Sequence, residues 1–157
     1  MNAKGFVLAE DAHLVLAVAP VDVNGGVNSD VWSMANYAHA SIVVALGVTG
    51  GTALITVEEC DDFTPTNHPE IAYASYSEVT AGGDTPGARA ATPSTGLLSS
   101  ANDGVFYLIE VDASQLSDGF PNMRVSFANP SAQTFGAIMV WLSGARYASY
   151  DSPTAIV

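Results

Sequence analysis

The apolar residues of this chain recur at every second position in most segments, and this period of two constrains the fold more than any other feature. The segment TALITVEEC places Ala53, Ile55 and Val57 on one face of an extended strand, and GVFYLIEVDA alternates in the same way. Val, Ile, Thr and aromatic residues, which suit a pleated and half-buried surface, fill these runs. No stretch keeps a helical period over ten or more residues. The alternation therefore predicts an all-β fold.

Two runs are apolar on both faces instead, SIVVALG at 41–47 and GAIMVWLSG at 136–144. Such runs indicate central strands that are covered on both faces. Further strands are expected near residues 12–18, 30–34 and 71–77, with Gly-, Pro- and Asn-rich turns between them. Eight or nine short strands are typical of a β-sandwich, a jelly roll or a barrel. Among these we predict a single antiparallel β-sandwich, in the form of a jelly roll.

The domain organisation follows from length and from the least regular segments. A chain of 157 residues is long enough for one well-buried core. The segment VDVNGGVNSD interrupts any regular strand near the start of the chain. We therefore predict an extended N-terminal arm over residues 1–29, a β-sandwich over residues 30–147 and a C-terminal tail over residues 148–157.

The charge of the chain excludes two classes of partner. Sixteen acidic residues stand against four basic ones, which gives a net charge of −12. A chain of this charge repels phosphate backbones and anionic lipid headgroups, and four scattered cations do not form a basic patch. No run approaches the length that a membrane-spanning helix needs. We therefore expect neither nucleic acid nor a membrane among the partners.

The segment ITVEECDDFTPTNHPE, residues 55–70, combines oxygen, sulfur and nitrogen ligand types. Strand alternation sends Glu58 and Cys60 to one face and Glu59 to the other, so these three donors do not converge on one ion. Asp61 and Asp62 follow in a turn whose spacing matches no EF-hand loop. We therefore predict no metal site here, and we interpret Cys60 as a free, small hydrophobic residue in a reducing environment.

The sequence contains none of the common catalytic motifs. His13, His39 and His68 have no metal or catalytic spacing, and the chain has no nucleophile elbow and no P-loop. We predict that the protein is not an enzyme and needs no cofactor. Exposed Trp and Tyr residues would instead suit a carbohydrate-binding sandwich, whereas buried ones fill a core or an oligomer interface.

The two ends of the chain are rich in apolar residues although they flank the regular strands. Soluble monomers avoid large exposed apolar patches, so we expect these ends to be buried in a homo-oligomer, with a trimer favoured. The residues predicted to form the partner or oligomer interface are Phe6, Val7, Leu8, Leu14, Leu16, Trp32, Tyr37, Tyr147 and Tyr150.

The segment SDVWSMANYAHASIVVALGVTGGTALITVEECDD, residues 29–62, resembles a recurring element of tailed-bacteriophage structural proteins. In that element a strand with a Trp-x-Met pattern (here Trp32 and Met34) leads through an Asn-Tyr pair (Asn36 and Tyr37) into an apolar strand, a Gly-rich turn and a Thr- and Val-rich strand. The later segments YLIEVDASQLSDGFPNMRVSFAN and VWLSGARY are similar to the second half of such proteins, so the resemblance covers about residues 30–147.

This resemblance implies a capsid decoration (cement) protein of jelly-roll or β-sandwich type. Such a protein is made in the host cytoplasm, binds the shell of major capsid protein and stabilises the outer surface of the virion. No functional residues carry over from the family, because these proteins act through surfaces. The alternative is a carbohydrate- or host-binding module of a head fibre or tail appendage, since similar β-modules occur there.

Overall fold

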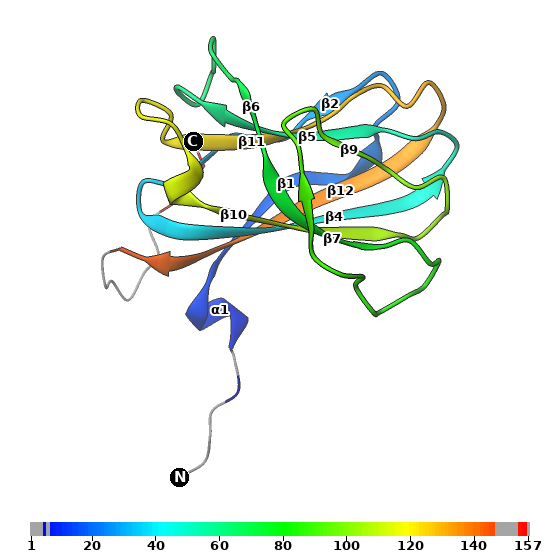
Figure 1. Cartoon of the computed structure of the whole chain (residues 1–157), viewed down its shortest axis with the longest axis horizontal. Helices are drawn as coiled ribbons and strands as arrows, with labels where there is room; N and C mark the ends of the chain where they lie inside the picture. Colours follow the sequence, from blue (N-terminus) through cyan, green and yellow to red (C-terminus); the bar gives the residue numbers. More distant parts are fainter. Residues whose placement is uncertain (1–4, 6, 147–153, 157) are drawn as a thin grey trace.

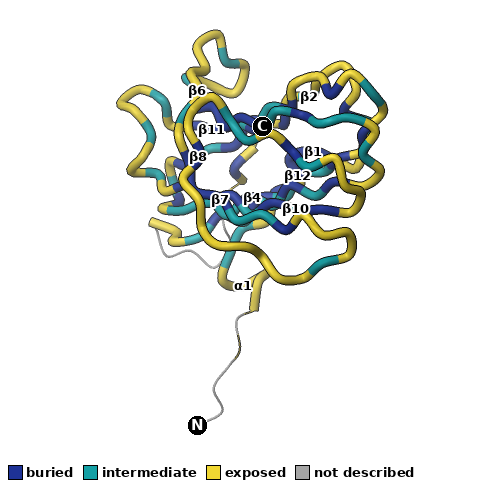
Figure 2. The backbone as a smooth tube through the Cα atoms, turned by 45° about the vertical axis from the view of Figure 1, so that its right-hand side comes forward, coloured by how far each residue is buried: buried dark blue, intermediate teal, exposed yellow. Residues whose placement is uncertain are grey.

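The computed structural model describes residue 5, residues 7–146 and residues 154–156 of the chain. Two antiparallel β-sheets pack face to face, with the apolar side chains between them (Figures 1 and 2). The elements are α1 (Leu8–Asp11), β1 (His13–Asp22), β2 (Val27–Asn28), β3 (Trp32–Ser33), β4 (Tyr37–Thr49), β5 (Leu54–Cys60), β6 (Glu70–Ile71), β7 (Tyr73–Glu78), β8 (Ala90–Thr92), β9 (Leu97–Leu98), β10 (Phe106–Asp112), the 3-10 helix η1 (Ala113–Gln115), β11 (Asn122–Phe127) and β12 (Thr134–Ala145).

The large sheet has six strands in the order β1-β12-β4-β10-β7-β8, and the small sheet has the order β2-β11-β5-β6. Strands β3 and β9 extend the small sheet by pairing with β11 and β5. The prediction of an all-β, antiparallel sandwich is confirmed. The jelly-roll connectivity is a finer statement and stays a prediction.

The period of two in the sequence places the core as expected. Ile55 and Val57 of β5 and Ile109 of β10 are fully buried, as are Val140 of β12 and Met123 of β11. Each of these strands turns alternate side chains into the space between the sheets, and Figure 2 shows the buried backbone there. Apolar burial of this kind is the main source of stability for such a fold.

The structure corrects the predicted boundary of the N-terminal arm. Residues His13–Asp22, which the prediction placed in the arm, form edge strand β1 and pair with β12 from His13↔Leu142 to Asp22↔Phe135. The physical reason is that Val15 and Ala17 alternate into the core, so their burial fixes the strand in the sheet. Only the described residues before His13, including α1, project from the sandwich (Figure 1).

The end of the chain also packs on the sandwich where the structure describes it. Ala155 is 1% exposed and belongs to the core, and its carbonyl oxygen accepts a hydrogen bond of 2.8 Å from the backbone N–H of Ser33. Residues 154–156 are therefore part of the domain rather than a separate tail.

Candidate interaction surface

Four residues of the predicted interface lie at the surface of the described structure. Leu14 and Leu16 of β1 are more than half exposed, and Val7 and Leu8 are exposed at the start of α1. Leu14 and Leu16 point away from the core, because Val15 between them is buried. An interface role for these four residues stays a prediction. Phe6, Tyr147 and Tyr150, which the same prediction named, lie outside the described residues.

Trp32 and Tyr37, in contrast, are core residues, so their predicted place at an interface is wrong. Trp32 is 0% exposed and Tyr37 is 2% exposed. Trp32 pairs with buried Met123 on β11, and the Tyr37 ring stacks on His13 with 5.7 Å between the ring centroids. Large aromatic side chains stabilise a fold most when they are buried, and both of these side chains lie in the core.

The outward side of the large sheet is apolar across five strands. Strand register aligns Leu16 of β1 with Met139 of β12, Met139 with Val43 of β4, Val43 with Leu108 of β10, and Leu108 with Tyr76 of β7. These side chains are exposed or half-buried, whereas on β1, β12, β4 and β10 their neighbours along the strand, which face inward, are buried. An antiparallel sheet with one face in water normally carries polar residues on that face.

Two further rows flank this central row. Leu14 pairs with Trp141 on one side of it, where the row continues with the polar residues Ser41 and Glu110. Ala137, Ala45 and Phe106 are aligned on the other side, where the row ends at Glu78. We call the apolar residues of the three rows together the outer apolar face, which consists of Leu14, Leu16, Val43, Ala45, Tyr76, Phe106, Leu108, Ala137, Met139 and Trp141.

Sequence reasoning missed this surface, although its signal was present. The runs at 41–47 and 136–144 carry apolar residues on both faces, and we expected both faces of these strands to be covered. The inner face is covered by the core, but Val43 and Met139 on the outer face retain access to solvent. The signal for a docking surface was therefore the excess of apolar residues on the face that the rest of the described chain leaves open.

A charged cluster lies at one end of the outer apolar face. The His39 ring bonds Glu110 Oε2 through Nε2 at 2.7 Å and Asp112 Oδ1 through Nδ1 at 2.8 Å, and the Ser41 hydroxyl also donates to Glu110 Oε2 at 2.7 Å. Burial alone would lower the pKa of His39, but the hydrogen bonds and charges of Asp112 and Glu110 outweigh it and raise that pKa. A protonated ring donates to both carboxylates at once, which its neutral form cannot do.

The carboxylates of residues 58–62 are used in structural contacts. Glu58 Oε2 accepts a hydrogen bond of 2.6 Å from Arg124 Nε and lies 3.0 Å from His68 Nδ1. Glu59 turns to the other face, where its Oε2 accepts a 2.7 Å hydrogen bond from the backbone N–H of Ser117. Burial raises the pKa of the Cys60 thiol to about 12, which keeps this sulfur protonated and unreactive.

Among the described residues, no group of three or more His, Cys, Asp or Glu side chains has a geometry that could hold a metal ion. Nor does any helix in the part of the chain that the structure describes have the length and hydrophobicity to cross a membrane.

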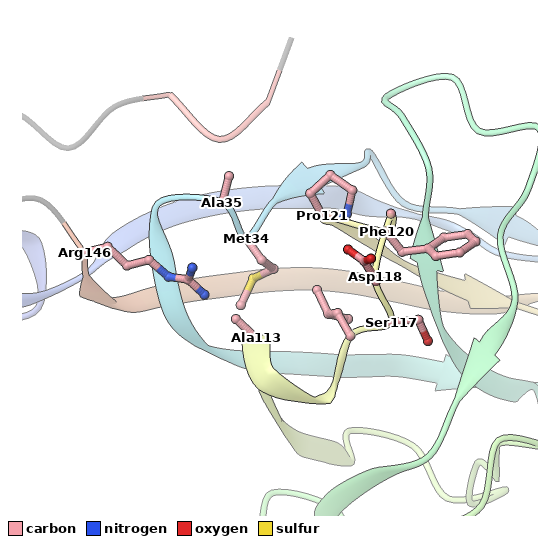
Figure 3. Close-up of a pocket in the computed structure, with 10 residues that line it drawn as sticks. Met34, Ala35, Ala113, Ser117, Asp118, Phe120, Pro121 and Arg146 are labelled. Atoms are coloured by element: carbon pink, nitrogen blue, oxygen red, sulfur yellow. The ribbon is translucent and has the colours of Figure 1, made fainter.

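An open cleft of about 390 Å³ lies at one end of the sandwich, between the loop after η1 and the start of β4. Met34 and Leu116 contribute apolar surface, and Asp118 and Arg146 supply opposite charges (Figure 3). Its described lining contains no histidine or cysteine.

Comparison with known proteins adds no relative to this description. No family model matches the chain, no curated protein matches its sequence and no solved structure matches its fold.

Proposed function

We propose that this chain is a structural protein of a virion, which decorates and stabilises the outer surface of a phage capsid by binding its shell of major capsid protein. One observation carries the proposal: the outward side of the large sheet presents the outer apolar face, whose central row crosses five strands. Soluble proteins rarely leave such a surface exposed to solvent, so we expect a binding partner to cover it. The resemblance of residues 29–62 to tailed-phage structural proteins indicates that this partner belongs to a virion.

The strand pairing supports the jelly-roll form of the proposed family. In a jelly roll the chain resembles one long antiparallel hairpin wound into two sheets. Here the early strands pair with the late ones in reverse order: β1 with β12, β2 with β11, β4 with β10 and β5 with β6. We propose that these eight strands form the jelly roll and that β7 and β8 extend the large sheet.

The charge of the chain supports a position outside the shell. The net charge of −12 leaves no affinity for packaged DNA, and Arg124, one of four basic residues, is held by Glu58. A protein on the outer surface of a virion needs no basic face. Under this proposal the chain is made in the host cytoplasm and has no catalytic role and no cofactor. It acts as a homo-oligomer, and the threefold points of a shell favour a trimer because three equivalent contacts gain from effective concentration.

Quantitative mass spectrometry of purified particles from the source of this sequence tests the proposal. A decoration protein is expected in hundreds of copies per particle, and immunogold labelling is expected over the head. Its absence from particles, or a few copies at the tail tip, would overturn the proposal.

The binding experiment uses expanded shells and a chain that lacks residues 1–12. This deletion removes the projecting segment and keeps β1, which a deletion to residue 28 would destroy. If the arm contributes to docking, the shortened chain should remain folded by circular dichroism and should bind shells with reduced occupancy. Full occupancy would contradict a role for the arm.

A second candidate function is favoured by two aromatic side chains. Tyr76 and Trp141 both lie half-buried on the outward side of the large sheet, where a sugar ring can stack on an aromatic residue. A carbohydrate- or host-binding module of a fibre or tail appendage would use them in this way. Specific binding on a glycan array that is lost in Trp141→Ala would favour this alternative over capsid decoration.

A further inference from the structure

We propose that the outer apolar face is covered by a second copy of this chain. The inference rests on the premise of the proposed function that this face is covered, and it names a second copy as the occupant. Contact with the shell is then left to other surfaces, such as the segment before His13. Its starting point is the central row from Leu16 to Tyr76, in which five consecutive strands present an apolar side chain at the same level of the sheet.

The size of this surface matches the requirement of a stable interface. Strand β1 has ten residues, β12 and β4 are longer, and β10 and β7 have seven and six. With strands about 4.8 Å apart and a rise of about 3.4 Å per residue, the outward side of these five strands covers roughly 700 Å². A standard stable interface buries about 800 Å² on each partner, so a second sheet laid over this side nearly satisfies that requirement.

The carboxylates on this side of the sheet already have donors within the chain. Glu110 is hydrogen-bonded to His39 and Ser41. Glu78, aligned with Phe106, is buried and accepts hydrogen bonds from the backbone N–H groups of Thr80 and Thr85. Neither carboxylate therefore depends on water alone, which lowers the cost of covering the face.

Charge also favours a second copy over a basic partner. Two chains of net charge −12 repel each other, and the repulsion is smallest where the facing surfaces carry no uncompensated charge. The ten residues of the outer apolar face include no Asp, Glu, Lys or Arg. A basic partner would instead be recognised by carboxylates without donors, whereas Glu110 and Glu78, which lie in the flanking rows, already accept hydrogen bonds within the chain. Two sheets packed about 10 Å apart through such side chains reproduce the packing inside a sandwich.

Sedimentation of the full chain at several concentrations is the first test. The wild-type protein should form an oligomer, and its dissociation constant should decrease as salt is added, because salt screens the repulsion between acidic chains. If the wild-type protein is monomeric at about 100 μM, a concentration far above the dissociation constants of stable interfaces, the proposal is overturned. Weaker association at high salt would also overturn it, since that result indicates contacts between opposite charges.

Three variants then locate the interface. Leu16→Glu lies on exposed edge strand β1, Leu108→Glu lies at the centre of the face, and the matched control Leu98→Glu replaces a leucine that is 63% exposed on β9, next to the small sheet. Both face variants should raise the dissociation constant at least about thirtyfold, the loss typical of an interface hot spot. The control should associate like the wild type.

Folding is verified by circular dichroism, and Leu16→Glu keeps the test valid if Leu108→Glu fails to fold, because Leu16 is already exposed. Association that persists in a folded face variant, or that is lost equally in Leu98→Glu, would overturn the assignment of the interface to this face. If the wild type is monomeric yet binds shells, and Leu16→Glu abolishes that binding, the occupant is the shell protein. That outcome rejects this inference and keeps the proposed function.

Discussion

The Arg124–Glu58 ion pair on the outward side of the small sheet should be a strong single contribution to stability. Arg124 Nε lies 2.6 Å from Glu58 Oε2, and the two side chains are 13% and 8% exposed. Loss of one partner from a buried pair costs about 3–5 kcal/mol, because the remaining charge stays buried without its counter-charge. His68 Nδ1 lies 3.0 Å from the same oxygen and keeps one contact. We therefore expect Arg124→Met to lower the free energy of unfolding by about 3 kcal/mol, near the low end of that range.

A double-mutant cycle separates the ion pair from other effects of the substitution. Replacing both partners, Glu58→Met with Arg124→Met, should restore stability to within about 1 kcal/mol of the wild type, because no buried charge is left unpaired. Arg146→Met is the matched control, since the Arg146 side chain is exposed, and its effect should stay below about 0.5 kcal/mol.

Urea unfolding monitored by circular dichroism and tryptophan fluorescence measures the wild type, Arg124→Met, Glu58→Met, the double variant and Arg146→Met. For a domain of this size, a loss of 3 kcal/mol corresponds to a decrease in Tm of about 6–12 °C. If Arg124→Met is as stable as Arg146→Met, or if the double variant is no more stable than Arg124→Met, the reasoning is refuted.

Three other substitutions test separate parts of the fold. The folded-state pKa of His39 is raised, so its contribution to stability should be complete below its ordinary pKa of 6.5 and decrease as pH rises through the folded value. His39→Gln should flatten that part of a plot of unfolding free energy against pH. An unchanged slope would contradict the contacts of the ring with both carboxylates. Leu142→Ala removes a fully buried side chain of β12 and should cost about 3 kcal/mol in urea unfolding, where a loss below 1 kcal/mol would contradict its close packing. Ala155→Asp places a carboxylate at a site that is 1% exposed and should lower Tm by at least about 5 °C, whereas wild-type stability would show that residues 154–156 do not need to pack on the sandwich.

Alternation in the sequence was sufficient to predict the inner side of the sandwich. Ile55 and Val57 were assigned to one face of a strand and Glu58 to the other, and the structure confirms this assignment: Ile55 and Val57 lie in the core, whereas Glu58 binds Arg124. The reason is that strand parity is a local property, which depends on neighbouring residues alone.

Placement that depends on contacts between distant segments could not be predicted in this way. A strand was expected near residues 12–18, but the irregular segment at 21–30 separated it from the predicted sandwich, and its inclusion in the large sheet depends on β12, which lies more than one hundred residues later. Trp32 and Tyr37 were suitable for either a core or an interface, and only the position of β11 and of His13 settled the choice. For the same reason the runs at 41–47 and 136–144 indicated strands with two apolar faces but not that one face remains open.

Strand β1 has a further consequence for how copies of the chain can grow into larger assemblies. It is an edge strand, it contains Pro20, and its register with β12 shifts between Leu16 and Val18 and again between Val18 and Val21. Proline lacks the N–H that a new strand would need, and bulges twist an edge away from regular pairing. At the opposite edge β8 has only three residues. Neither edge of the large sheet is therefore a good template for pairing with a strand of another chain, and this protects the apolar large sheet against open-ended fibre growth through its edges.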